Sequence, residues 1–203
     1  MTNPPAADAE DGEAIRAVLS GDQEAFRRLV EKYAGSIFNL AYRMTGNPAD
    51  AEDLAQEAFI QAYARLQAFR IGSRFHPWIY TIALNLCRSH LRRRSLPRWL
   101  PSPRRRGEDR PPAAEISDRS PDPEQAVLAL EAEDRLQKAI DALPSKYREV
   151  FVLRQSQELS YEEIAGLSGL PLGTVEVRLF RARRLLLKAL EASGLRATKT
   201  RVK

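Results

Sequence analysis

The sequence predicts an all-α protein of two small helical domains, joined by a flexible proline-rich linker and ending in a helix-turn-helix. Apolar residues recur at helical spacing in almost every patterned segment, and no convincing run of alternating β-branched residues indicates a strand. Residues 96–123 hold seven of the 13 prolines, as an extended linker would. The expected division is a disordered tail at 1–11, a helical domain at 12–95, the linker at 96–123, a second helical domain at 124–192 and a basic tail at 193–203.

The first domain is expected to contain three main helices. The first begins at Gly21-Asp22 and is broken by Gly46-Asn47-Pro48, a combination that helices do not continue through. The second runs from about 49 to 67, and its apolar stripe follows strict helical spacing. A loop over 67–77 leads to the third helix, which begins near Pro77, because proline suits a first helical turn.

The second domain should resume helical structure near Glu124 and again after Pro144-Ser145. Its last part has the features of a helix-turn-helix. Ser160 and Glu163 form a capping box at the start of one helix. Gly169 lies where the chain must turn, and it tolerates the positive φ that such a turn requires.

The helix that follows Pro171 and Thr174 divides into two faces. At about 100° per residue, one side gathers a narrow apolar stripe and the opposite side is basic. The stripe is Val175, Leu179, Ala182 and Leu186, and the opposite face carries Val177, Phe180, Arg181 and Arg184. Such a helix suits a DNA major groove; the alternative is an amphipathic hairpin with a solvated basic face.

Composition fits an anionic partner without proving one, since the net charge is +5 and arginines cluster over residues 88–106. A single cysteine, Cys87, excludes an internal disulfide. The first residues lack the pattern of a secretory signal, and no apolar run is long enough for membrane insertion. We therefore expect a soluble protein of the cytoplasm.

We find no pattern typical of an enzyme, such as a phosphate-binding loop, a dinucleotide turn or a catalytic triad. Cys87 and His90 have the spacing of half a metal site, but no other ligands gather near them. We expect Cys87 to be a core residue, no metal site and no cofactor.

Three segments resemble the bacterial sigma-70 family, and most closely its extracytoplasmic-function (ECF) branch. They are DAEDLAQEAFIQAYARL at 50–66, FHPWIYTIALNLCRSHLRRR at 75–94, and the stretch from LPSKYREVF to the helix-turn-helix at 143–186. Their order and spacing match the family over most of 22–95 and 125–190. The resemblance implies a sigma factor: a dissociable subunit that gives core RNA polymerase its promoter specificity in transcription initiation. By this resemblance, residues 12–95 are expected to form the region 2 domain and residues 124–192 the region 4 domain.

The resemblance implies that Asp53, Gln56 and Glu57 bind core polymerase. The other interpretation of these residues is a solvated polar face.

In region 2 the resemblance also implies a site that melts the −10 element. Unstacked bases need aromatic rings and cations. The candidates are Phe69, Arg70, Arg74, Phe75, Trp78, Asn85 and Arg88. Core packing is the alternative for the three aromatic side chains, and His76-Pro77 departs from the family pattern before Trp78.

In region 4 the resemblance implies that the last helix reads the −35 element as duplex. The candidates are Thr174, Glu176, Val177, Arg178, Phe180, Arg181 and Arg184. Glu176 and Val177 depart from the residues usual in the family, which leaves the promoter sequence open.

An anti-sigma factor is a further partner that the resemblance implies. The alternatives are a stand-alone helix-turn-helix transcriptional regulator and a protein-interaction module.

Overall fold

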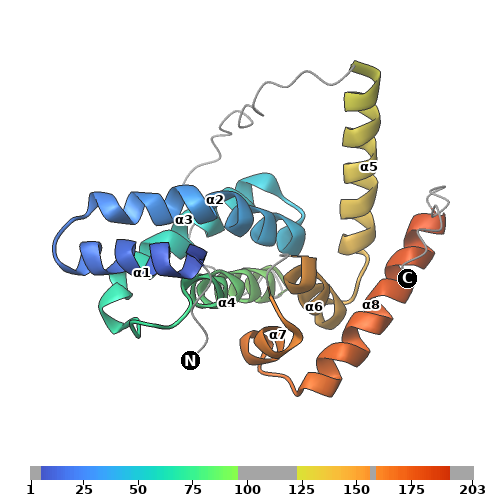
Figure 1. The fold of residues 1–203 in the computed structure, drawn as a ribbon. Coiled ribbons are helices and arrows are strands. Elements are labelled where there is room, and N and C mark those ends of the chain that lie inside the picture. The colour runs from blue at the N-terminus through green and yellow to red at the C-terminus, as the bar shows by residue number, and fades with distance from the viewer. Residues whose placement is uncertain (1–5, 96–122, 156–158, 193–203) are drawn as a thin grey trace.

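The computed structural model describes residues 6–95, 123–155 and 159–192, and within these ranges all regular structure is helical (Figure 1). The elements in chain order are α1 (Ala6–Leu19), α2 (Glu24–Thr45), α3 (Pro48–Ala64), a 3₁₀ turn η1 (Leu66–Ala68), α4 (Phe75–Ser95), α5 (Pro123–Asp141), α6 (Ser145–Gln155), α7 (Tyr161–Ser168) and α8 (Leu172–Ala192). The predicted all-α class is confirmed. Most of the expected linker, at 96–122, and the basic tail at 193–203 lie outside the described residues.

Helices α1 to α4 pack together around one core. The break between α2 and α3 is the one expected: Gly46 adopts φ 68° at the end of α2, and the Asn47 side chain accepts hydrogen bonds from the amides of Ala49 and Asp50 at the start of α3. The apolar stripe of α3 is buried, as its spacing predicts. Helix α3 ends at Ala64, three residues before the expected end, and the chain continues into η1.

Helix α1 corrects the prediction that residues 1–11 form a disordered tail, because the chain is helical from Ala6. Asp11 explains why this acidic segment is ordered. Its buried carboxylate accepts hydrogen bonds from Lys32 Nζ, at 2.5 Å, and from Tyr33 Oη, both on α2. The partners lie 21 and 22 residues along the chain, so no local pattern could indicate them.

Helices α5 to α8 form the second packed group. The expected capping box is present: Ser160 Oγ accepts from the Glu163 amide, and the Glu163 carboxylate accepts from the Ser160 amide. Gly169 ends α7 in the left-handed conformation at φ 68°. The stripe Val175, Leu179, Ala182 and Leu186 is buried, so α8 presents the opposite face outward.

The two groups of helices also pack against each other. The end of α2 lies against α5 and α6, and α4 lies against α7 (Figure 1). The sequence predicts two helical domains joined by a flexible linker and does not indicate this contact between them. In the part of the chain that the structure describes, no helix is both long and apolar enough to cross a bilayer.

Candidate functional site

Helix α3 presents a polar face to solvent. Asp53, Gln56 and Glu57 are all exposed, because the buried stripe of α3 occupies the other side of the helix. The Gln61 side-chain amide donates to Glu57 Oε1 at 2.7 Å and extends the polar surface by one turn. The structure therefore brings the three predicted polymerase-binding residues together on one accessible face.

Ile60 is a feature of this face that sequence reasoning missed. Its side chain is 62% exposed. At about 100° per residue it lies between Gln56 and Asp53, within about 60° of Glu57. An exposed isoleucine amid polar groups gives an interface an apolar anchor. The helical wheel alone could have indicated it.

The aromatic residues of the loop after η1 and of the first turn of α4 are divided between core and surface. Phe69 and Phe75 are buried, and their rings pack at centroid distances of 5.0 Å and 5.6 Å from the ring of Trp78. Core packing, the alternative that the sequence left open, is therefore the environment of both phenylalanines in this structure. Trp78 is half-buried.

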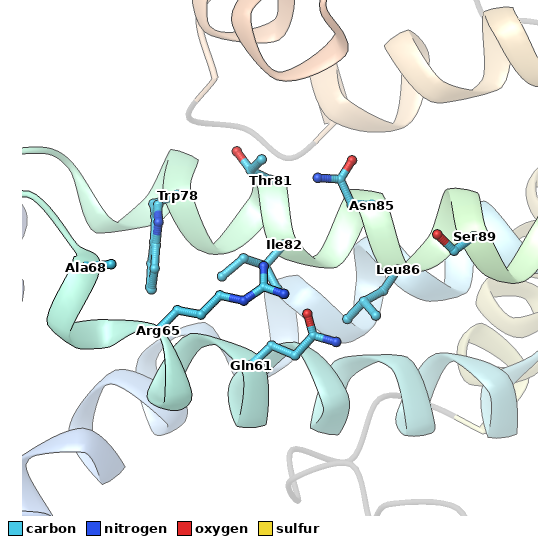
Figure 2. Close-up of a pocket in the computed structure, with 9 residues that line it drawn as sticks. All are labelled: Gln61, Arg65, Ala68, Trp78, Thr81, Ile82, Asn85, Leu86 and Ser89. Atoms are coloured by element: carbon cyan, nitrogen blue, oxygen red, sulfur yellow. The ribbon is translucent and has the colours of Figure 1, made fainter.

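A groove lies between α3 and α4, beside Trp78, with a volume of about 460 Å³. Figure 2 shows Gln61 of α3 and Arg65, the residue that follows α3, reaching into it, with the Trp78 ring at one end. Ile82 and Leu86 supply apolar lining from α4. The groove thus combines an aromatic face, apolar contacts and hydrogen-bonding groups. Its complete lining is Gln61, Arg65, Ala68, Trp78, Thr81, Ile82, Asn85, Leu86 and Ser89.

The other predicted −10 residues lie near this groove or along α4. Arg70 is exposed. Asn85 is exposed on α4 and accepts a hydrogen bond from Arg88 Nη1 at 3.2 Å. Arg74 and Arg88 both pair with carboxylates of the second domain, Arg74 with Glu163 and Arg88 with Glu149. These two pairings were not expected.

Helix α8 carries the predicted −35 residues on its outward face. Val177 is 50% exposed and Phe180 is 62% exposed, which is unusual for large apolar side chains. Glu176, Arg181 and Arg184 are exposed beside them. Thr174 and Arg178 are half-buried. The arrangement matches the two-faced helix that the sequence predicts.

Arg181 interacts with a residue of α6. The Arg181 guanidinium, as a hydrogen-bond donor and a nearby positive charge, holds the pKa of the Tyr147 phenol on α6 below its ordinary value.

Cys87 lies in the core, as expected, and burial raises the pKa of its thiol to about 12. His90 is buried on the same helix, with Nε2 3.3 Å from Asp50 Oδ2. Over the described ranges, no three His, Cys, Asp or Glu side chains gather as metal ligands would.

Comparison with known proteins matches two family descriptions to this chain. Sigma-70 region 2 matches residues 29–96, and Sigma-70, region 4 matches residues 133–186. The first range covers most of α2 and all of α3 and α4, and the second covers the end of α5, all of α6 and α7 and most of α8. The −10 candidates lie in the first match, and the −35 candidates lie in the second.

Whole-chain relatives agree. The ECF RNA polymerase sigma factor SigW of Bacillus subtilis (strain 168) is 40% identical over 176 residues, which cover 87% of this chain and 94% of the relative. The ECF RNA polymerase sigma-E factor of Escherichia coli (strain K12) is 33% identical over 182 residues, covering 83% and 88%.

Among solved structures, CnrH in complex with the cytosolic domain of CnrY aligns with a TM-score of 0.65 at 26% identity, covering 90% of this chain and 98% of that one. The sigma factor RpoE of Bartonella quintana, in complex with the anti-sigma factor NepR, shares the fold with a TM-score of 0.60 at 24% identity, covering 82% and 96%. The agreement of both regions, in order and over most of the chain, makes this protein a member of the ECF branch of the sigma-70 family, the subunits that direct bacterial RNA polymerase to promoters.

Proposed function

We propose that this sigma factor binds core polymerase through the outward face of α3, holds the opened −10 strand at the groove between α3 and α4, and reads the −35 duplex with α8. The observation that supports this division of labour most directly is the placement of the three faces. The three places are distinct, on the outward side of α3, in the α3–α4 groove and on α8, and each carries exposed or half-buried residues that the family pattern leads us to expect.

The α3 face suits a helix-on-helix contact. Asp53, Gln56 and Glu57 offer charge and hydrogen bonds that set partner choice, while Ile60 offers apolar area to bury. A face that is polar throughout would gain little free energy on leaving water. The isoleucine at its centre therefore favours a binding surface over a merely solvated one.

The α3–α4 groove suits an unstacked base. A flipped base needs a ring to stack on and polar groups for its edge, which Trp78 on one side and Gln61, Arg65 and Asn85 around the lining supply. We assign Phe69 and Phe75 the role of holding Trp78 and the loop, because their rings are buried. Arg70, Arg74 and Arg88 supply cations for the strand's phosphates.

The α8 face suits the major groove. Arg181 matches the donor pattern that guanine accepts, and Val177 and Phe180 supply apolar contacts of the kind that a thymine methyl makes. Arg178 and Arg184 would bind phosphates, and Thr174 lies in the first turn of α8, where amides can hold a phosphate. Glu176 suits cytosine, which donates from its amino group.

We also propose an anti-sigma factor as a partner. CnrH was solved in complex with the cytosolic domain of CnrY, and the Bartonella RpoE in complex with the anti-sigma factor NepR; this chain shares their fold. We place the protein in the cytoplasm with the polymerase, and we assign it no catalytic step of its own.

Transcription with purified core enzyme tests the proposal. Run-off transcription from DNA upstream of the protein's own gene should require both the core enzyme and this chain. A stand-alone regulator, the alternative, would bind a specific duplex tightly without polymerase and would leave promoter choice unchanged.

Two variants separate the faces. The double substitution Asp53→Ala/Gln56→Ala should weaken core binding about tenfold or more, because these groups set the contact, while leaving the circular dichroism spectrum unchanged. Arg181→Ala should reduce promoter use, with a loss of about 1–3 kcal/mol in −35 binding, while core binding persists. Glu31→Ala and Arg135→Ala, exposed residues of α2 and α5, are the matched controls.

A further inference from the structure

Two polar side chains extend into the groove between α3 and α4. Gln61 and Arg65 reach between the two helices from the α3 side (Figure 2). Ile82 and Leu86 line the α4 side of this space with apolar groups. A base that stacks on the Trp78 ring in the groove therefore meets the Gln61 amide and the Arg65 guanidinium.

Glu57 fixes which end of the Gln61 amide faces the groove. Gln61 Nε2 donates to Glu57 Oε1 at 2.7 Å, one turn earlier on α3. An ionised carboxylate only accepts hydrogen bonds, so the amide nitrogen must face Glu57 and the amide oxygen must face elsewhere. Figure 2 shows that oxygen directed toward α4, across the groove. The half-buried Gln61 thus gives the groove an acceptor of fixed direction.

Arg65 places a donor next to this acceptor. It is the residue that follows α3, and its guanidinium lies between the Trp78 ring and the Gln61 amide in Figure 2. A guanidinium only donates hydrogen bonds. The groove therefore offers a base edge one fixed acceptor and one donor, side by side.

The four bases differ in how they meet such a pair. Adenine N6 and cytosine N4 are amino groups, which donate, and each lies beside a ring nitrogen, which accepts. Guanine and thymine carry a carbonyl oxygen in place of that amino group. Opposite Gln61 Oε1 the amino group forms a hydrogen bond, whereas the carbonyl oxygen brings two acceptors together and leaves both without a donor.

We propose that Gln61 is a specificity-determining residue of −10 recognition: oriented by Glu57, its amide oxygen selects adenine or cytosine at the groove over guanine or thymine. The inference rests on the proposed function for the groove as the place of an unstacked base. It rests on the bond between Gln61 and Glu57 for the direction of the acceptor.

Glu57 connects this selection to the polymerase-binding face. Its side chain is exposed beside Asp53 and Gln56, and the bond to Gln61 uses Oε1. A carboxylate has acceptor capacity on both oxygens, so a polymerase donor at Oε2 leaves the bond to Gln61 intact. Such a donor restrains the carboxylate and, through it, the amide. A substitution on the polymerase-binding face is therefore expected to change base preference as well as core affinity.

The experiment first locates the base that the groove holds. Holoenzyme binds a fork-junction DNA taken from upstream of the protein's own gene, with the −10 bases of one strand unpaired. Each unpaired base is replaced in turn by an abasic site. Trp78→Leu removes the stacking ring and keeps an apolar side chain, so the position at the groove is the one whose abasic penalty disappears in this variant.

The second step removes only the amino group of the located base. Purine replaces adenine, or pyrimidin-2-one replaces cytosine. Wild-type holoenzyme should lose about tenfold in affinity, while Gln61→Met, which lacks the acceptor, should lose less than about twofold. Gln67→Met changes an exposed glutamine of η1 and is the matched control, with the wild-type loss expected.

The third step releases the amide from Glu57. In Glu57→Ala the Gln61 amide can turn its NH2 group toward the groove and donate to a carbonyl oxygen. The preference for adenine or cytosine over guanine or thymine should therefore fall by about threefold or more. The ratio is measured with σ chain bound to core at saturation, so weaker core binding does not enter it. Glu52→Ala, also exposed on α3, is the matched control and should keep the wild-type ratio.

Each result bears on a different statement. A wild-type preference for guanine or thymine at the located position, or an equal loss in wild type and Gln61→Met when the amino group is removed, would overturn the role of Gln61. An unchanged ratio in Glu57→Ala would overturn the orientation by Glu57. The proposed function of the groove fails in the first step instead, where Trp78→Leu would leave the abasic penalty unchanged at every position.

Discussion

Ile60 is the residue that distinguishes the α3 face from an ordinary solvated helix surface. Polar residues on an exposed helix face are common and need no partner. The Ile60 side chain is 62% exposed among them, and burying it in an interface is favourable because apolar area leaves water. The isoleucine therefore carries information that Asp53, Gln56 and Glu57 do not carry by themselves.

Ile60→Asp should weaken core binding by about tenfold or more, because it places an uncompensated charge at the centre of the contact. The fold should be retained, since the position is exposed in the free chain. Affinity for core polymerase, measured by titration of a labelled chain, gives the result. Leu130→Asp on α5, also exposed, is the control, and equal loss in both variants would contradict a specific role for Ile60.

Cys87 predicts a pH dependence of stability. Its folded-state pKa is raised to about 12 from an ordinary value of 9.0, so the thiol is neutral in the folded chain over the physiological range. The contribution to stability is present below pH 9 and is lost as pH rises from there toward 12, by up to about 4 kcal/mol. Urea unfolding at increasing pH measures the loss, and Cys87→Ala should show a smaller decline above pH 9.

At the scale of the element, α7 and its turn depend on backbone geometry more than on packing. The helix is only eight residues long, too short to be stable alone, so its two ends matter. The capping box provides hydrogen-bond acceptors for amides at the first end. At the other end, Gly169 at φ 68° donates its backbone N–H to the Ala165 carbonyl oxygen. These features aim α8 outward from α7.

Two glycines of this hairpin should respond oppositely to the same substitution. Gly169→Ala should destabilise the protein by about 1–2 kcal/mol, because a side chain strains the left-handed conformation. Gly166→Ala, inside α7 with open space around it, should stabilise by about 0.5–1 kcal/mol. Thermal unfolding of the two variants measures the difference, and destabilisation by both would contradict a conformational origin.

At the scale of the whole molecule, Arg148 links the two domains. It donates to the Met44 carbonyl oxygen of region 2 and to the carbonyl oxygens of Asp141 and Leu143 in region 4. One side chain thereby completes helix ends in both domains. Removing the Arg148 side chain should therefore destabilise both domains where they meet.

Arg148→Ala should lower the free energy of unfolding by about 1–3 kcal/mol, because three carbonyl groups at the domain contact, two of them partly buried, lose their donor. Hydrogen exchange should quicken at the end of α2 as well as in α6. Arg154→Ala is the comparison, since Arg154 donates to the Leu159 carbonyl oxygen of its own domain. If Arg148→Ala left exchange in α2 unchanged, the proposed coupling would be wrong.

Most of the elements could be predicted from the sequence because their signals are local. The α2–α3 break at Gly46-Asn47-Pro48, the capping box at Ser160 and the two faces of α8 each depend on residues within a few turns of one another. The candidate site was predicted in part for the same reason. Periodicity places residues on a helix face, but it does not say whether Phe69 and Phe75 turn toward the core or toward DNA.

The sequence alone determined most of the helices, their exposed faces and the family, because spacing along a helix translates directly into direction around its axis. Only the tertiary structure decided which charges meet. The ordering of α1 by Asp11, the groove beside Trp78, and the pairing of Arg88 with Glu149 all join residues far apart in the chain. Such contacts depend on how whole helices dock, and no local pattern records that docking.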